Sequence, residues 1–261
     1  AAQVTDDINK AISNGDLECT TLLLDEWASL FSTSLSVGFL GSAPIVTLLL
    51  SRGLDTEFYA DALIAACCKS DYDLDVLQAF VDSGWDINSY LGYVGDLLAL
   101  CLHSSPMVKW AIEHGADPNA NCNSATLSAL ESAINNEDFE SAEILIDMGG
   151  AQINNTNALK YAARSGYTNM IELLLAKGAE IDEIPRPEYA CDLMLTRHNT
   201  GMGTALHQAA MTGQLDAVKL LLERGADPRL KNLVGKTALE LAREEHHMMV
   251  ADVLAAAESV V

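Results

Sequence analysis

A short phrase recurs along the chain: an apolar run followed by glycine, a small residue and an acidic residue. Clear copies end at Gly225-Ala226-Asp227 and Gly178-Ala179-Glu180, and earlier copies end at Gly115-Ala116-Asp117 and Gly53-Leu54-Asp55. With weaker copies at Gly84 and Gly149, successive glycines lie 31, 31, 34, 29 and 47 residues apart. A period of about 33 residues indicates a repeat protein, in which each unit packs only on its neighbours.

Each unit has the pattern of two helices. A first segment rich in small residues, such as 158–166 or 204–213, precedes a second with leucine at i, i+3 and i+4, the spacing of a buried stripe. The glycine ends the second helix in a left-handed conformation, and the residues after it, such as Asp117-Pro118-Asn119, turn the chain toward the next unit. We therefore expect an all-α solenoid of stacked helix-turn-helix units with connecting hairpin loops.

The segment from Thr204 to Gly213 resembles the ankyrin-repeat hallmark T-P-L-H-x-A-A-x-x-G, with Ala205 in place of proline. Residues 237–242 resemble it more loosely, and the units before Asn157 are degenerate. The resemblance covers about residues 6–257 and implies that His207 is structural, binding backbone groups between units. It predicts one ankyrin-repeat domain over residues 1–261, with approximate units 6–31, 32–57, 58–89, 90–120, 121–155, 156–183, 203–233 and 234–258.

The interval of 47 residues between the last two glycines indicates an insert at residues 184–202. We expect it to be an extended hairpin or loop. Long loops in compact folds are often functional. A tolerated surface insertion is the alternative, because lengthening a loop costs little entropy.

The chain is strongly acidic, with a formal net charge of −22. Residues 1–156 contain 4 Lys/Arg and 23 Asp/Glu, whereas residues 157–261 contain 11 and 14. Such a surface disfavours binding to nucleic acids and to anionic membranes. The acidic half would instead attract a basic protein partner, with a strong dependence on salt.

The sequence contains no pattern of a catalytic, cofactor or metal site. The six cysteines include no C-x-x-C pair, which favours free thiols in a reducing compartment and an intracellular, cytoplasmic or nuclear, location. We find no G-x-S-x-G, P-loop or G-x-G-x-x-G motif, and the histidines lack metal-ligand spacing. We expect no cofactor, no metal and no enzymatic activity.

The ankyrin resemblance implies that a partner binds in a concave groove. This groove is lined by the hairpin tips and by the exposed ends of the first helices. The residue after the paired small residues points there, which selects Ser13, Cys67, His103, Asn135, Arg164, Met211 and Glu244. Exposed tyrosines near the tips and polar residues of the insert are further candidates. The predicted partner-binding residues are Tyr59, Tyr90, Tyr93, His103, Asn135, Arg164, Tyr189, Arg197, His198 and Met211.

The prediction is a scaffold or adaptor that binds a protein segment in its groove. Two alternatives stay open. One is an enzyme on an ankyrin scaffold, with a pocket between groove and insert at which Arg164, His103, Glu131 and Arg197 converge. The other is an ankyrin fragment of a larger multidomain protein. The partner and the oligomeric state cannot be derived from the sequence, because fold alone does not determine function.

Overall fold

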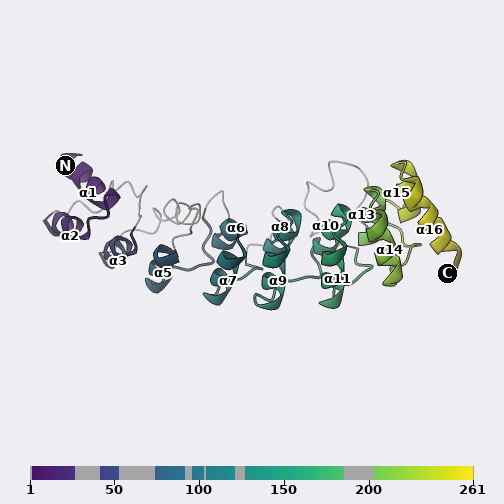
Figure 1. Cartoon of the computed structure of the whole chain (residues 1–261), viewed down its shortest axis with the longest axis horizontal. Helices are drawn as coiled ribbons and strands as arrows, with labels where there is room; N and C mark the ends of the chain where they lie inside the picture. Colours follow the sequence, from purple (N-terminus) through teal and green to yellow (C-terminus); the bar gives the residue numbers. More distant parts are fainter. Residues whose placement is uncertain are drawn as a thin grey trace. The chain divides into compact units, whose positions relative to one another are not determined.

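The computed structural model of the chain describes residues 2–26, 42–52, 74–91, 96–102, 104–120, 127–184 and 203–260. Every regular element in these ranges is an α-helix, which confirms the predicted all-α class (Figure 1). The helices form two compact units, which we consider separately. One comprises residues 1–101 and 113–116, and the other comprises residues 102–112 and 117–261.

The first unit contains helices α1 (Ala2–Ser13), α2 (Leu17–Glu26), α3 (Ala43–Ser51), α5 (Leu74–Asp82) and α6 (Leu97–Cys101). Helix α1 packs on α2, α2 on α3, and α3 on α5. Leu24, Leu49 and Phe80 are almost completely buried in this unit. Trp85 meets the Phe80 ring edge to face at 6.4 Å, as expected for a packing residue.

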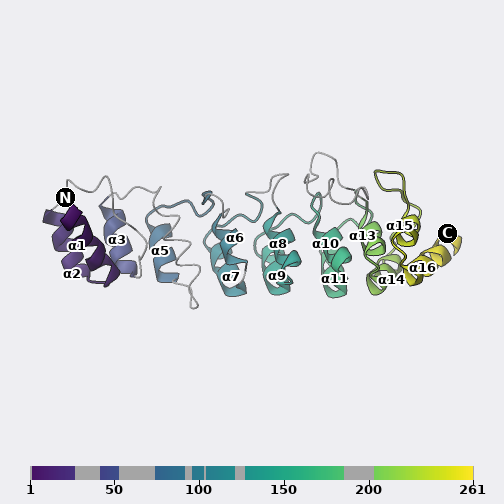
Figure 2. The ribbon, with the colours of Figure 1, turned by 90° about the horizontal axis from the view of Figure 1, so that it is seen from above.

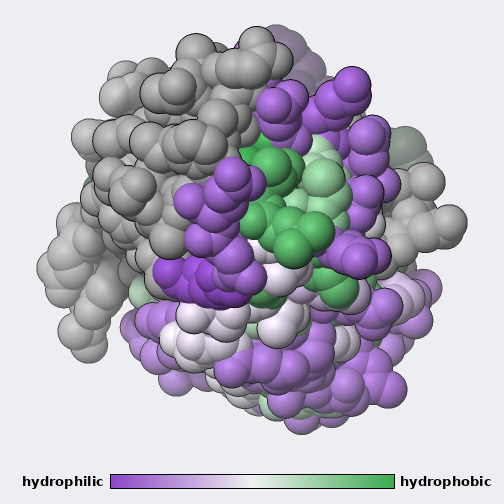
Figure 3. All heavy atoms as spheres, turned by 90° about the vertical axis from the view of Figure 1, so that its left-hand side faces the viewer, coloured by the Kyte–Doolittle hydropathy of each residue, from purple (hydrophilic) through white to green (hydrophobic). Residues whose placement is uncertain are grey.

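Apolar residues are also visible on the surface of this unit. Seen from the end that carries α1 and α2, a group of apolar side chains lies among hydrophilic ones (Figure 3). In α2, Leu22 is 63% exposed and Leu17 is 41% exposed.

The second unit contains α7 (Ser105–Glu113) up to residue 112, followed by four helix pairs. The pairs are α8 (Ala129–Asn135) with α9 (Phe139–Asp147), α10 (Ala158–Ser165) with α11 (Thr168–Ala176), α13 (Ala205–Met211) with α14 (Leu215–Glu223), and α15 (Ala238–Glu244) with α16 (Met248–Val260). The first helices of the pairs contact one another in chain order and form one layer (Figures 1 and 2). We call them the inner helices; they are α8, α10, α13 and α15. Helices α9, α11, α14 and α16 form the other layer.

Small side chains explain the close approach of the inner helices. Ala162, Ala163, Ala209 and Ala210 are fully buried, so α10 and α13 pack directly on each other. This contact joins the two repeats on either side of the insert. In the outer layer, each helix buries a leucine stripe, as Leu174, Leu221 and Leu254 show.

Most inner helices begin with a capping box. The Ser128 side chain accepts from the Glu131 amide while the Glu131 carboxylate accepts from the Ser128 amide, and Thr237 with Glu240 does the same. Thr204 and His207 make the equivalent arrangement, in which the imidazole replaces the carboxylate. The hallmark positions are therefore helix-start signals.

One glycine assignment made from sequence is wrong. The left-handed residue after α9 is Gly150, with φ 65°, and not Gly149. A Cβ on Gly149 would lie 2.9 Å from the Leu145 carbonyl oxygen and from Ile112 Cδ1, so that glycine is required by close packing. The other described helix-ending glycines, Gly84, Gly115, Gly178 and Gly225, have φ between 89° and 95°.

Candidate partner-binding surface

The carboxyl-terminal ends of the inner helices present one side chain per repeat. Asn135, Met211 and Glu244 are the last residues of α8, α13 and α15, and Arg164 is the second-last residue of α10. Asn135, Arg164 and Glu244 are exposed and Met211 is half-buried. Because these helices contact one another in order, the four residues form a row, which we call the inner row.

A repeated left-handed turn follows each inner helix. The residues with positive φ are Glu137 (61°), Gly166 (79°), Gly213 (74°) and His246 (63°). Because Glu137 and His246 are not glycines, the equivalence of these four turns cannot be recognised from the sequence. The turn reverses the chain within two or three residues and brings the outer helix of the same pair alongside the inner one.

The residue after each turn reaches back to the preceding repeat. Tyr167 Oη donates to Glu137 Oε1 at 2.6 Å, and the Tyr167 ring meets Phe139 edge to face at 5.1 Å. The hydrogen bond to Glu137 raises the pKa of the Tyr167 phenol. These contacts join the loop after α8 to the loop after α10.

The next two repeats use the same position to bind backbone carbonyls. Gln214 Nε2 donates to the Arg164 carbonyl at 3.2 Å, and Thr212 Oγ1 donates to the same oxygen at 2.8 Å. His247 Nε2 donates to the Met211 carbonyl at 3.1 Å. The backbone of two inner-row residues is thus bound to the following repeat, which fixes the spacing along the row.

A ladder of hydrogen bonds links the hairpin loops. Its members stand four residues after the left-handed glycines that begin the hairpins, Gly84, Gly115, Gly150, Gly178 and Gly225. Asn119 Nδ2 donates to the Gly150 carbonyl at 3.2 Å while Asn119 Oδ1 accepts from the Gln152 amide at 2.9 Å. Asn154 makes the same pair of bonds with Gly178 and Glu180. The remaining positions of this asparagine ladder are Asn88, Asp182 and Arg229.

Asp182 makes only one side of the hydrogen-bond pair that Asn119 and Asn154 make. Both carboxylate oxygens accept from the Asp227 amide at 3.2 Å, and a carboxylate has no proton to donate to the neighbouring glycine carbonyl. Burial raises the pKa of the Asp182 carboxyl, and the charge of Asp227 raises it further, although the bond from the Asp227 amide opposes the shift.

His207 has the structural role that the ankyrin resemblance implies. Its Nδ1 accepts from the Thr204 amide at 3.2 Å, so Nε2 carries the proton and donates to the Lys236 carbonyl at 3.1 Å. Burial lowers the pKa of the His207 imidazole, which keeps the ring neutral in this arrangement. The residue fastens α13 to the next hairpin.

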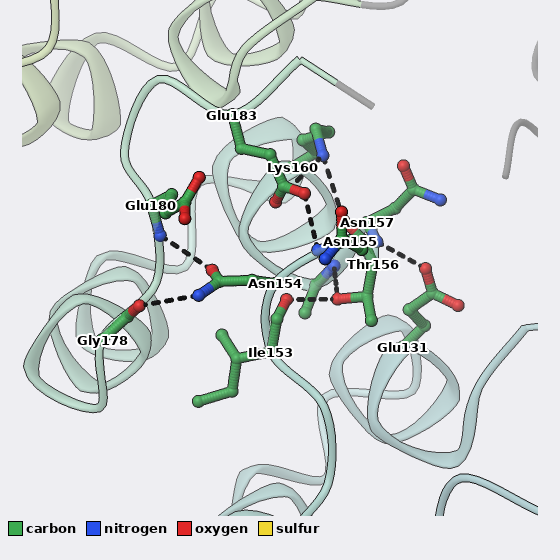
Figure 4. Close-up of polar contacts among 11 residues, drawn as sticks. Glu131, Ile153, Asn154, Asn155, Thr156, Asn157, Lys160, Gly178, Glu180 and Glu183 are labelled. Carbon is green, nitrogen blue, oxygen red and sulfur yellow. Dashed lines mark hydrogen bonds and ion pairs between the residues drawn. The ribbon is translucent and has the colours of Figure 1, made fainter. Parts of the chain in front are cut away.

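Lys160 occupies the corresponding position in α10, as Figure 4 shows. Its buried Nζ donates to the Thr156 carbonyl at 3.0 Å and lies 3.8 Å from Glu183 Oε2. Burial lowers the pKa of the Lys160 ammonium, and the charges of Glu183 and Glu131 oppose this shift. Glu183 Oε1 also accepts from the Asn155 amide at 2.6 Å, which anchors the chain directly before the insert.

Glu131 is used by the scaffold. Its two oxygens accept from the Ser128 amide at 2.7 Å and from the Asn157 amide at 2.6 Å, at the start of the next inner helix. Arg164 lies near the opposite end of that helix, so the structure does not bring Glu131 and Arg164 together. The described groups with shifted pKa values, Lys160, Tyr167, Asp182 and His207, all lie in contacts between repeats.

Of the other predicted site residues, Tyr90 is 68% exposed and belongs to the first unit. The predicted partner-binding residues that lie outside the described ranges are Tyr59, Tyr93, His103, Tyr189, Arg197 and His198. Sequence analysis missed Tyr167, Gln214 and His247, which bind successive repeats. The signal that would have found the asparagine ladder is the fixed offset of four residues from each glycine.

The described part of the chain holds no cluster of three or more potential metal ligands. Of the two described cysteines, Cys19 is exposed and Cys101 is buried. None of the described helices is long and apolar enough to cross a membrane.

A family model described as ankyrin repeats (3 copies) matches residues 96–184 and 188–260, which is more than half of the chain. The chain belongs to the ankyrin-repeat family. This match confirms the predicted fold family, and its second segment begins at residue 188, within the region assigned to the insert. Ankyrin repeats generally mediate contacts between proteins.

Three relatives illustrate the range of proteins that carry similar ankyrin repeats. The chain is 32% identical over 133 residues to the E3 ubiquitin-protein ligase hecd-1 of Caenorhabditis elegans, covering 48% of this chain and 4% of the relative. It is 34% identical over 105 residues to ankyrin repeat and SOCS box protein 11 of Danio rerio, covering 33% and 36%. It is 24% identical over 207 residues to SH3 and multiple ankyrin repeat domains protein 2 of Homo sapiens, covering 76% and 10%.

Proposed function

We propose that this ankyrin-repeat chain is a protein-binding scaffold whose inner row contacts a segment of the partner. The row comprises Asn135, Arg164, Met211 and Glu244. The observation that carries the proposal is that three of these side chains are exposed and Met211 is half-buried, while the backbone of Arg164 and Met211 is bound to the next repeat. A rigid surface with differing side chains loses little conformational entropy on binding.

The chemistry of the row favours specific contacts. Arg164 is the one cation of the four, and Met211 provides an apolar side chain that adapts to irregular surfaces. Arginine is among the residues that most often dominate the energy of protein interfaces. We propose that Arg164 and Met211 contribute most of the affinity, with Asn135 and Glu244 setting specificity.

Electrostatic attraction supports a basic partner at the acidic half of the chain. Acidic side chains of α1, α2 and the turn between them are exposed, among them Asp6, Asp7, Asp16, Glu18 and Glu26. We propose that this charge accelerates association and that the insert, residues 184–202, touches the same ligand. Increasing salt should then slow association without an equal change in dissociation.

Site-specific photo-crosslinking tests the inner row. A benzophenone amino acid is placed singly at positions 135, 164 and 211, and as controls at exposed outer-helix positions Glu143 and Lys219. Each protein is irradiated in extract of the native cells. The proposal predicts one shared adduct from the three row positions that is missing from both controls.

Two variants then measure the contribution of the row to the identified complex. Arg164→Glu should weaken binding at least tenfold, about 1.4 kcal/mol, whereas Lys219→Glu, an equal change of charge on an outer helix, should have little effect. Replacing residues 185–202 with a glycine-serine linker tests the insert. Adducts confined to the control positions, or equal affinities for both charge variants, would refute the proposed surface.

A further inference from the structure

The hairpin between α14 and α15 has a tip that is held by several hydrogen bonds. Asn232 is buried and organises the turn. Its Oδ1 accepts from the Val234 amide at 3.1 Å and from the Lys236 amide at 2.9 Å. Its own amide donates to the Lys236 carbonyl at 2.9 Å, and its carbonyl accepts from Gly235, whose φ is 84°.

This rigid tip presents two apolar side chains to solvent. Leu233 is 51% exposed and Val234 is 50% exposed. The base of the hairpin is fixed on both sides. His207 binds the Lys236 carbonyl, and the Arg229 guanidinium donates to the Glu258 carbonyl at 2.8 Å. An apolar tip held in one conformation meets the requirement for an interface anchor, because little freedom remains to be lost on binding.

The charge of this hairpin is opposite to that of the chain. Residues 228–239 contain Arg229, Lys231 and Lys236 and no acidic residue, in a chain whose formal net charge is −22. Lys231 is exposed, and Lys236 Nζ binds Glu244 Oε2 at 2.6 Å while remaining 39% exposed. After the left-handed glycine, the described parts of the other hairpins, residues 85–91, 116–120, 151–157 and 179–184, contain no Lys or Arg.

We propose that Leu233 and Val234, together with Lys231, Lys236 and Arg229, form a docking point for an acidic protein segment that carries a large apolar side chain. We call this surface the basic hairpin. The apolar side chain of the ligand packs on the tip, and its carboxylates lie against the flanking cations. This inference rests on the proposed scaffold function and adds a partner chemistry opposite to that expected at the acidic half.

Charge and shape favour a peptide over other anions. A polyphosphate backbone or an anionic bilayer would bring many negative charges close to a molecule with an excess of 22 of its own. A short acidic segment brings few charges, and the apolar tip gives it contacts that a phosphate lacks. A second copy of this chain also carries the net charge of −22 and is repelled at low salt.

Peptide selection tests the basic hairpin. A phage library of random peptides is panned against the full chain, and the enriched peptides are synthesised with a fluorescent label and titrated by anisotropy. We expect peptides rich in Asp and Glu with at least one Leu, Ile or Phe. Their affinity should fall about tenfold or more in the double variant Leu233→Ser with Val234→Ser, and also in Lys231→Glu.

Matched controls separate local contacts from general effects. Met249, 69% exposed in α16, controls for loss of exposed apolar surface as Met249→Ser, and Lys219→Glu controls for charge. Both should bind the peptides as the unaltered chain does. Circular dichroism checks that the hairpin variants remain folded, which we expect because Leu233, Val234 and Lys231 are all exposed.

Several results would overturn the inference. One is a library that yields no peptide sensitive to the hairpin variants. If its peptides respond to Arg164→Glu instead, the scaffold function stands and the basic hairpin fails. Hairpin-dependent binding to phosphatidylserine vesicles or to single-stranded DNA without peptide binding would assign the surface to another ligand. Sedimentation showing self-association that Lys231→Glu abolishes would assign it to a second copy.

Discussion

The substitution Asp182→Asn should stabilise the protein by completing the asparagine ladder. Asn119 and Asn154 each accept from one backbone amide and donate to one glycine carbonyl, whereas Asp182 only accepts, from Asp227. The asparagine would add a hydrogen bond to the Gly225 carbonyl and remove a negative charge that faces Asp227. A hydrogen bond contributes about 0.5–1.5 kcal/mol of net stability. Because this site is partly exposed, we expect the unfolding free energy to increase by ~0.5–1 kcal/mol.

The pH dependence of this effect has a defined sign. Because the folded state raises the pKa of the Asp182 carboxyl, the protein gains stability from this group at a pH below the unfolded value of about 4 and loses it as the pH rises through the folded pKa. The advantage of Asp182→Asn is therefore largest at neutral pH. It should narrow as the pH falls toward the raised folded pKa of the Asp182 carboxyl.

Urea unfolding of the variant and the unaltered chain measures the difference, and hydrogen exchange at the Asp227 amide reports the local bond. Asn154→Asp, the reverse change at an equivalent position, should destabilise by about 1 kcal/mol. Asp252→Asn removes an exposed charge from α16 and should change little. An Asp182→Asn protein that is no more stable at pH 7, or whose advantage grows on acidification, would refute the reasoning.

Three further predictions concern the joints between repeats. Because folding lowers the pKa of His207, the stability that its neutral ring provides should fall as the pH drops below about 6.5. The unfolding free energy from urea titration should exceed that of His207→Ala by about 2 kcal/mol at pH 7.5, and this difference should shrink by pH 5.5. His246→Gly relieves a left-handed φ of 63° and should raise the unfolding free energy by up to about 1 kcal/mol in the same assay, whereas a loss would contradict the backbone argument. Gly166→Ala, at φ 79° and with its Cβ 2.6 Å from Gln214 Oε1, should cost about 1–2 kcal/mol in thermal unfolding, and an unchanged midpoint would show that the turn relaxes freely.

The sequence was sufficient to predict the helical class and the period, because these depend on local signals: small residues in the inner helix and a leucine stripe in the outer helix. The structural role of His207 followed from the resemblance of residues 204–213 to the ankyrin hallmark. The positions of Asn135, Arg164 and Met211 in the inner row also followed from counting within the repeat.

Other features depend on conformation or on partners distant in sequence. Glu137 and His246 adopt a conformation that sequence analysis assigns to glycine, because neighbouring contacts over-determine the turn. Of two adjacent glycines, the one that turns is Gly150, because Gly149 is confined by Ile112 and the Leu145 carbonyl. The burial of Lys160 could not be inferred, because a lysine at that position is acceptable only with Glu183 and the Thr156 carbonyl beside it.

The bond between Asp182 and Asp227 spans 45 residues and closes the hairpin ladder on either side of the insert. Helices α10 and α13 are in direct contact as well, so the two neighbouring repeats are joined without help from the intervening segment. The insert position, residues 184–202, is therefore a suitable site for grafting foreign loops. Since each doubling of loop length costs only about 0.6 kcal/mol in closure entropy, sequences of very different size could be exchanged there while the stack on both sides is preserved.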